Sequence, residues 1–233
     1  MGFNYYISNR DDGNISFYAG TGDVLANRKA ICTKIGLLIE NLVVMKQSHS
    51  SDFYVVGMED ASKGALNGES ALNNVDALIT SEKDFVLMVQ GADCPLIGLY
   101  NEESGVLAAI HSGWKGTLGR IIPRVLEHMK AEMGCDHKFT KVIVSPFAKG
   151  CCYEVGEEFR ETFKDNSSAF NYKDDKLFFD LEIILKEQLL SCGIRQEMIF
   201  VEDECTICGK NFYSYRKNKS NAGRFSLLVW MTS

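Results

Sequence analysis

The chain has 233 residues, which allows one large domain or two small ones and burial of about 70% of the unfolded surface. Apolar residues make up 45% and charged residues 24% of the sequence, so a disordered or fibrous protein is excluded. The formal net charge of -6 argues against a broad surface for nucleic acid or for anionic membranes.

The sequence carries no signal for a membrane or for export. No apolar run approaches the roughly 18 to 20 residues of a membrane span, and the first residues lack the basic and then apolar layout of a secretion signal. We therefore expect a soluble, cytoplasmic protein whose eight cysteines are reduced. Because no linker-like tract interrupts the sequence, we expect residues 1–233 to form a single domain. A monomer and a weak homodimer are both compatible with the sequence.

The first third of the chain predicts a hairpin, a helix and three strands. Aromatic and branched residues at 3–8 and 15–19 flank a turn-rich stretch, as in a β-hairpin. Apolar residues recur at helical spacing over 24–39. Strands are expected at 42–46, 53–57 and 75–80.

The rest of the chain alternates between strands and helices. Three very apolar runs at 85–90, 96–100 and 106–111 predict a buried sheet. An apolar stripe predicts a helix over 117–133, ended by Gly134. The remaining expected elements are strands at 142–146, 198–202, 212–216 and 225–230, and helices at 155–164 and 180–191. Several strands follow each other at hairpin distance, so we predict the α+β class with a mixed sheet flanked by helices.

Three polar residues at strand ends have the chemistry of a metal site. Cys94 lies in a tight turn between two predicted strands, His111 ends the next strand, and His49 follows an earlier strand. Two imidazoles and one thiolate suit a zinc ion with an open fourth position. A buried cysteine beside two hydrogen-bonded histidines would give the same pattern, and spacing does not distinguish the two. The four histidines of the chain cannot supply a multicopper oxidase cluster.

Two further groups of residues have both a functional and a structural interpretation. Cys205 and Cys208 form a CxxC pair, as in half of a zinc ribbon or in a redox pair. A ribbon needs a second such pair, and Cys151 and Cys152 are adjacent instead, so we favour an ordinary structural role. The basic segment 213–224 is typical of an anion or phosphate site, or of a solvated loop between strands.

Taken together, these residues resemble the laccase-domain family, whose members are also called polyphenol oxidase-like or purine nucleoside phosphorylase proteins. The matching motifs run in family order across nearly the whole chain. They are QSHS with His49, VDALIT, GADCPLIGLY with Cys94, AAIHSGWKGT with His111, CCYEVG at 151–156, and CT, YSYR and AGR near the end.

The resemblance implies a single α/β domain, similar to a cysteine-histidine deamidase toxin domain, in which His49, Cys94 and His111 bind one zinc ion beside a pocket. Zinc is the expected ion, and copper is a possible alternative in vitro. Family members are reported to cleave adenosine, inosine, guanosine and methylthioadenosine with phosphate, and to deaminate adenosine. We therefore predict a purine nucleoside phosphorylase, with adenosine deaminase as a possible second activity, whose partners are purine nucleosides and phosphate.

The chain departs from the family pattern in two places. Ser145, Pro146, Phe147 and Ala148 stand where the family usually has Gly, Pro, any residue and Ile, and Lys115 stands where Arg is common. Lysine keeps the positive charge but loses the forked donor geometry of arginine. Both changes touch loops predicted to line the pocket, so they bear on substrate preference and leave the metal triad intact.

Phosphorolysis requires alignment of two charged reactants, so positioning and electrostatics carry most of the rate. Gln47 is expected to bond a purine or ribose edge and Tyr153 to line the pocket. Asp93 is expected to orient a ligand or accept a proton, or only to cap its turn. The residues predicted to hold phosphate are Arg28, Lys115, Arg216 and Arg224. For deamination, a zinc-bound water would attack the purine C6.

Two other functions remain open at this point. A metal-free hydrolase or deamidase would use Cys94 as nucleophile and His111 as base. A non-enzymatic nucleotide-binding module would use the triad only to hold its structure.

Overall fold

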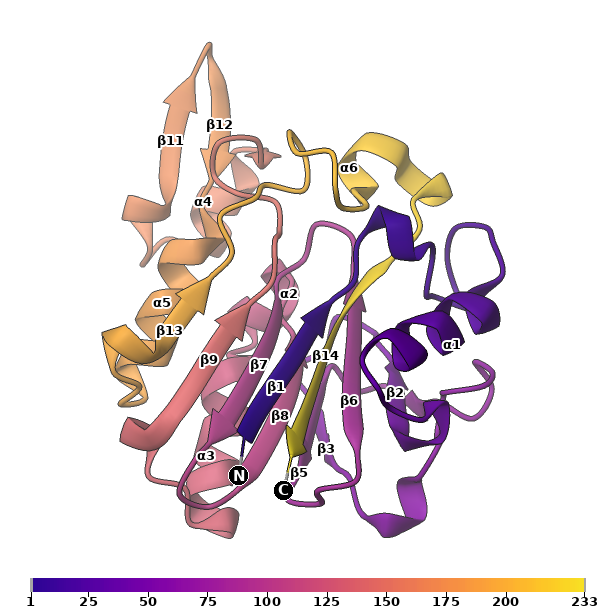
Figure 1. Cartoon of the computed structure of the whole chain (residues 1–233). Coiled ribbons are helices and arrows are strands. Elements are labelled where there is room, and N and C mark those ends of the chain that lie inside the picture. Colours follow the sequence, from indigo (N-terminus) through magenta and orange to yellow (C-terminus); the bar gives the residue numbers. More distant parts are fainter. Residues whose placement is uncertain (1, 233) are drawn as a thin grey trace.

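Residues 2–232 are described by the computed structural model, in which two larger β-sheets pack face to face (Figure 1). The first sheet has the order β1 (Gly2–Ile7), β14 (Phe225–Thr232), β6 (Val86–Gly91), β2 (Leu42–Lys46) and β4 (Leu72–Asn73). The second has the order β13 (Ile199–Val201), β9 (Thr140–Val144), β7 (Leu96–Asn101), β8 (Val106–His111), β5 (Ala77–Thr80) and β3 (Phe53–Val55). Both sheets combine parallel and antiparallel neighbours. The predicted mixed α+β class is confirmed.

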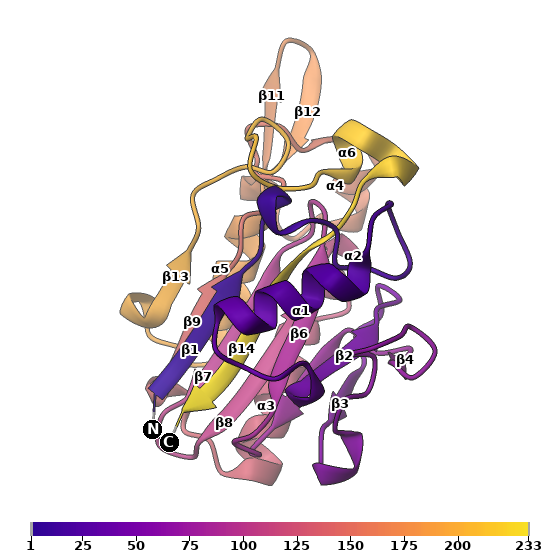
Figure 2. The same cartoon turned by 45° about the vertical axis from the view of Figure 1, so that its right-hand side comes forward.

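The apolar core lies between the sheets and extends over both outer faces. Leu87 and Leu227 of the first sheet and Leu107 of the second belong to the cluster between the sheets. On the outer face of the second sheet lie α3 (Ile121–Met133) and α5 (Leu181–Ser191), and on that of the first lies α1 (Val24–Lys34) (Figure 2). The central strands are buried on both faces, which explains why they read as continuous apolar runs.

Local backbone signals set the ends of the helices. The Asp23 carboxylate accepts a hydrogen bond from Ala26 N and caps α1, which stops before Gly36 at a φ of +73°. The helix expected over 117–133 is divided, because Arg120 takes a left-handed φ of +58° between α2 (Trp114–Leu118) and α3. Gly134, also left-handed at +68°, ends α3 as predicted.

Two expected strands are wrong. The segment 15–19 does not pair with the first strand; β1 pairs instead with β14 at the other end of the sequence, Gly2 opposite Thr232. Within 212–216, the side chain of Ser214 caps the short helix α6 (Tyr215–Asn218). Aromatic residues fit both a strand and a half-buried loop, so composition alone could not separate the two.

The structure adds a small third sheet that the sequence interpretation missed. It consists of β10 (Glu154–Val155), β12 (Lys176–Phe179) and β11 (Phe170–Lys173), and its hairpin β11–β12 projects from one end of the molecule, near α4 (Glu158–Thr162) (Figures 1 and 2). Asp174 and Asp175 form the turn with positive φ angles of 51° and 59°, which aspartate adopts more readily than most residues. None of the helices within 2–232 combines the length and the apolar character needed to cross a membrane.

Candidate functional site

The three predicted metal ligands meet where three strands end. His49 follows β2, Cys94 follows β6 of the same sheet, and His111 is the last residue of β8 in the other sheet. Their ligand atoms all lie within 4.8 Å of one another, and the two imidazole rings stand edge to face at 4.9 Å between centroids. The packing of the two sheets therefore assembles a triad that is scattered over 63 positions of sequence (49 to 111).

Asp76, which the sequence interpretation did not select, anchors this triad. Its fully buried carboxylate accepts a hydrogen bond from His111 Nδ1 at 2.8 Å and from His49 N at 3.0 Å. It also accepts from the backbone and the hydroxyl groups of Ser48 and Ser50. One carboxylate thus fixes the turn that carries His49 and directs the Nε2 atom of His111 toward Cys94.

The triad is electrostatically coupled. Burial alone would raise the pKa of the Cys94 thiol, yet the charge of His111 and hydrogen bonds from both histidines lower it. Burial alone would lower the pKa of His111, yet Cys94 and Asp76 raise it. The Asp76 pKa lies well below its usual range because hydrogen bonds and the charge of His111 outweigh its burial. The arrangement favours a thiolate, which is the form that binds metals.

The residues present fit a metal ion with three protein ligands. Two imidazoles and one thiolate are a donor set that zinc accepts, and a carboxylate behind a ligating histidine is its usual support. Gly113 leaves the space open, since a Cβ at this position would come within 2.9 Å of Cys94 Sγ and 3.5 Å of His49 Cδ2. His49 is exposed, so the open side of the triad is accessible.

The triad lies in the wall of a cavity of about 450 Å³, a size typical of small-molecule sites. Trp114, Tyr18 and Tyr215 add aromatic surface to the lining. The predicted site residues that line the cavity are Gln47, His49, Asp93, Cys94, His111, Tyr153, Arg216 and Arg224. The structure thus brings eight of the ten predicted site residues to one space.

Asp93 ties two loops together across the cavity. Its Oδ1 atom accepts a hydrogen bond from Thr206 Oγ1 at 2.7 Å, and its Oδ2 atom accepts from Arg216 N at 2.6 Å. Its carbonyl accepts from Ala148 N, and its φ of +89° is unusual for a residue with a side chain. The Asp93 side chain therefore joins its own turn to the loops of Thr206 and Arg216, and its expected role toward a ligand stays a prediction.

Arg216 and Tyr153 form one wall of the cavity. The guanidinium group lies 4.7 Å from the centre of the Tyr153 ring and donates a hydrogen bond to Glu154 O. Burial, together with the nearby Cys94 charge, raises the pKa of Tyr153 to about 12. The phenol therefore keeps its proton and can donate a hydrogen bond into the cavity.

Gln47 has a different role from the one expected. Its side-chain amide forms two hydrogen bonds to the backbone of Gln90, 2.7 Å to the carbonyl and 2.9 Å from the N–H. This pairing places the side chain of Gln90, 6% exposed, in the cavity wall. Among residues 2–232, Gln90 Oε1 finds no hydrogen-bond partner. Gln47 and Gln90 both line the cavity, and the Gln90 oxygen itself is buried.

Two predicted phosphate ligands lie outside the cavity lining. Arg28 is 1% exposed, and its guanidinium group donates to the carbonyls of Ile15, Gly64 and Ala65. It is a structural residue that joins three loop carbonyls, and burial lowers its pKa to about 10. Lys115 is exposed on α2 with its ammonium group over the Trp114 ring. The sequence around Arg28 and Lys115 shows that both residues are basic and lie in or near helices, but it does not show where their side chains point.

The segment that departs from the family pattern is well packed. Ser145 is fully buried and its hydroxyl accepts a hydrogen bond from Leu96 N, while Phe147 is buried under the Lys149 ammonium group. Ala148 lines the cavity. A small residue at this position leaves room beside Tyr153.

A family model described as multi-copper polyphenol oxidoreductase laccase matches residues 10–232. The chain belongs to this family. Proteins similar to this chain are named for other reactions. A purine nucleoside phosphorylase from Clostridium acetobutylicum is 32% identical over 97% of this chain and 92% of its own length. A purine nucleoside phosphorylase from Aquifex aeolicus is 42% identical over 66% of this chain and 70% of its own.

Another relative is named for deamination. An adenosine deaminase from an unknown prokaryotic organism is 31% identical over 86% of this chain and 79% of its own length. The crystal structure of YlmD from Geobacillus stearothermophilus superposes with a TM-score of 0.89 at 25% identity, over 94% of this chain and 85% of that one. This chain therefore shares its fold with YlmD.

Proposed function

We propose that this chain is a metal-dependent purine nucleoside phosphorylase that forms one catalytic domain over residues 1–233. One observation carries the proposal: the triad and two arginines face the same cavity of about 450 Å³. The names of the relatives agree with it. The substrates proposed are adenosine, inosine, guanosine and methylthioadenosine, with inorganic phosphate as the second reactant.

The reaction sets what the cavity must do. A phosphate oxygen forms a bond to the ribose anomeric carbon, while the bond from that carbon to the purine nitrogen breaks. The electron pair leaves with the purine, which takes up a proton, and the sugar becomes ribose 1-phosphate. Positive charge on the sugar and negative charge on phosphate and purine therefore have to be stabilised together.

The two arginines of the lining are the proposed phosphate ligands. Two hydrogen bonds fix Arg216. Its backbone N–H donates to the Asp93 carboxylate, and its guanidinium group donates to the backbone carbonyl of Glu154. Arg224 is half-buried and donates to the carbonyls of Ala222 and Gly223. Guanidinium groups held in this way bind phosphate oxygens with forked geometry. The Tyr153 hydroxyl is left to recognise the nucleoside.

His49, Cys94 and His111 are proposed to hold one zinc ion. When bound, such an ion supplies Lewis-acid stabilisation of the group that reaches its open position. Asp76 holds the proton on His111 Nδ1, so that Nε2 is the atom left for the ion. Aromatic side chains of Trp114 and Tyr18 exclude water from the cavity and offer stacking surface to a purine.

A second candidate is a thiol-dependent hydrolase or deamidase. Cys94, His111 and Asp76 are linked by hydrogen bonds in that order, which is the geometry of a nucleophile, a base and the group that orients the base. This function predicts rapid alkylation of Cys94 with loss of activity and no sensitivity to chelators. The zinc-dependent function predicts that zinc protects Cys94 from alkylation. Adenosine deaminase activity is a possible addition to either function.

Chromatography of adenosine and inosine incubated with the zinc-loaded protein tests the proposal. We expect adenine and hypoxanthine to appear only when phosphate is present. Inosine formed from adenosine without phosphate would show that the protein also has adenosine deaminase activity. Base release that is equal with and without phosphate would show hydrolysis and contradict the proposal.

A further inference from the structure

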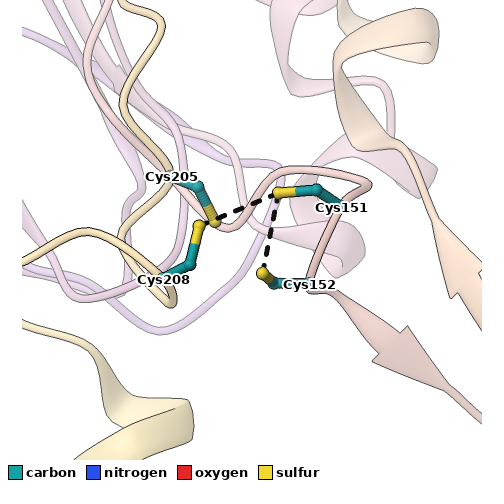
Figure 3. A group of neighbouring side chains, drawn as sticks. All are labelled: Cys151, Cys152, Cys205 and Cys208. Atoms are coloured by element: carbon teal, nitrogen blue, oxygen red, sulfur yellow. Dashed lines mark hydrogen bonds between the residues drawn. The ribbon is translucent and has the colours of Figure 1, made fainter.

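Four cysteines from two distant segments meet outside the cavity. Cys151 and Cys152 lie in the turn before β10, and Cys205 and Cys208 lie in the loop after β13 (Figure 3). Their sulfur atoms all lie within 4.8 Å of one another, with 3.6 Å between Cys151 and Cys152 and 4.0 Å between Cys151 and Cys208. All four are free thiols. The sequence interpretation had assigned them no common role.

These spacings match a tetrahedral metal site. Zinc binds thiolates at about 2.3 Å, so the sulfur atoms of a tetrahedral site are about 3.8 Å apart. Consecutive residues of a strand would point to opposite faces. Here Cys152 N and Tyr153 N both donate to Lys149 O, and this turn directs the two neighbouring thiols to the same side (Figure 3).

The second pair lies in a turn suited to thiolates. The backbone N–H groups of Cys208, Lys149 and Ile207 face the Cys205 sulfur. Gly209 closes the turn through its N–H to Cys205 O, and a Cβ here would come within 2.6 Å of that oxygen. Backbone donors of this kind support sulfur ligands.

We infer that Cys151, Cys152, Cys205 and Cys208 form a structural zinc site, distinct from the triad and independent of the proposed function. Four sulfur ligands close the coordination sphere, so this site has no position for a substrate. Cys151 and Cys208 are exposed, which gives the ion a path of entry from solvent.

The site would fasten together two loops that shape the cavity. Thr206, next to Cys205, donates to Asp93, and Tyr153, next to Cys152, lies under Arg216. Phe147 and Cys205 already form an isolated bridge between the same loops. Zinc would add a cross-link between segments separated by more than 50 residues of sequence, which lowers the entropy of the unfolded chain.

Metal analysis of the reduced protein tests this inference. We expect Cys208→Ser and Cys151→Ser each to hold about one zinc ion per chain fewer than the parent protein, which should hold about two when the triad is also occupied. His111→Ala should also retain about one ion, and Cys192→Ser, which changes a cysteine outside both sites, should retain about two. After exchange with cobalt, the His111→Ala protein should show the absorption of cobalt bound to thiolates, and Cys208→Ser should lose most of it.

A measurement on the unchanged chain covers the case in which a variant fails to fold. Alkylation with iodoacetamide followed by peptide mapping should show zinc-dependent protection of all four cysteines, with Cys192 unprotected. Equal alkylation with and without zinc would overturn the inference, as would equal zinc content in the parent protein and Cys208→Ser. A disulfide among the four cysteines in the protein as isolated under reducing conditions would overturn it as well.

Discussion

The two clusters of side chains proposed to bind metal differ in donors, in support and in surroundings. The triad joins two imidazoles to one thiol, has a buried carboxylate behind it and faces the cavity. The four-cysteine cluster joins four thiols from two turns, is supported by backbone N–H groups, and contributes no cysteine to the cavity lining.

Ligand number explains what each cluster can do. Three protein ligands leave a position for a reacting group, whereas four sulfur ligands do not. Asp93 connects the two regions, since it precedes Cys94 and accepts a hydrogen bond from Thr206 beside Cys205. One cluster is therefore suited to chemistry and the other to holding the cavity wall.

The largest effect on activity is expected from His111→Ala. It removes a ligand of the triad and leaves Asp76 buried without its imidazole partner. Loss of Lewis-acid stabilisation of several kcal/mol corresponds to a fall of about a thousandfold in kcat/KM. The zinc ion of the triad and phosphorolysis should be lost together, while the four-cysteine cluster keeps its ion. Full activity in a variant whose triad holds no zinc would remove the distinction between the two clusters.

Asp76→Asn should weaken the triad without removing a ligand. The amide cannot accept from both the His111 ring and the Ser48 to Ser50 turn as the carboxylate does. We expect the zinc affinity of the triad to fall about 10- to 100-fold, measured by competition with a chromophoric chelator. The four-cysteine cluster should keep its affinity, and equal weakening at both sites would contradict the account.

Arg216→Ala should act on phosphate more than on the nucleoside. Loss of a charged hydrogen-bond donor costs about 1.5 to 3 kcal/mol, which is roughly a tenfold or greater rise in KM for phosphate. Steady-state kinetics with varied phosphate measure it, and Arg160→Ala, an exposed arginine outside the cavity lining, is the control. A change confined to KM for the nucleoside would show that Arg216 does not bind phosphate.

Arg28→Met should affect stability and leave kinetics nearly unchanged. The substitution leaves the buried carbonyls of Ile15, Gly64 and Ala65 without their donor. We expect a loss of about 2 to 4 kcal/mol in the free energy of unfolding, measured with urea. A rise in KM for phosphate as large as in Arg216→Ala would indicate that Arg28 binds phosphate.

The central strands were predicted because each is a strong local signal, and the family motifs singled out His49, Cys94 and His111, which the structure brings together. The runs at 85–90 and 106–111 are apolar on both faces, and His49, Cys94 and His111 lie at strand ends. Asp76 was missed although it lies in a motif that was recognised. A carboxylate just before an apolar strand gives no local sign of the imidazole that it meets in the folded chain.

The remaining differences arise from long-range contacts. Arg28 and Arg216 are both basic residues in polar surroundings, and only folding places the first under three carbonyls and the second in the cavity. Cys151 and Cys208 are 57 residues apart, counted from 151 to 208, and their proximity follows from the loops that flank β9 and β13. Spacing rules for zinc ribbons do not cover ligands supplied in this way.

Phosphorus NMR of inosine, phosphate and the zinc-loaded protein tests the central claim most directly. We predict a ribose 1-phosphate resonance that grows in a one-to-one ratio with released hypoxanthine, persists in Cys192→Ser and disappears in His111→Ala. Hypoxanthine released without any sugar phosphate, or a sugar phosphate formed equally by His111→Ala, would contradict a phosphorylase that depends on the triad.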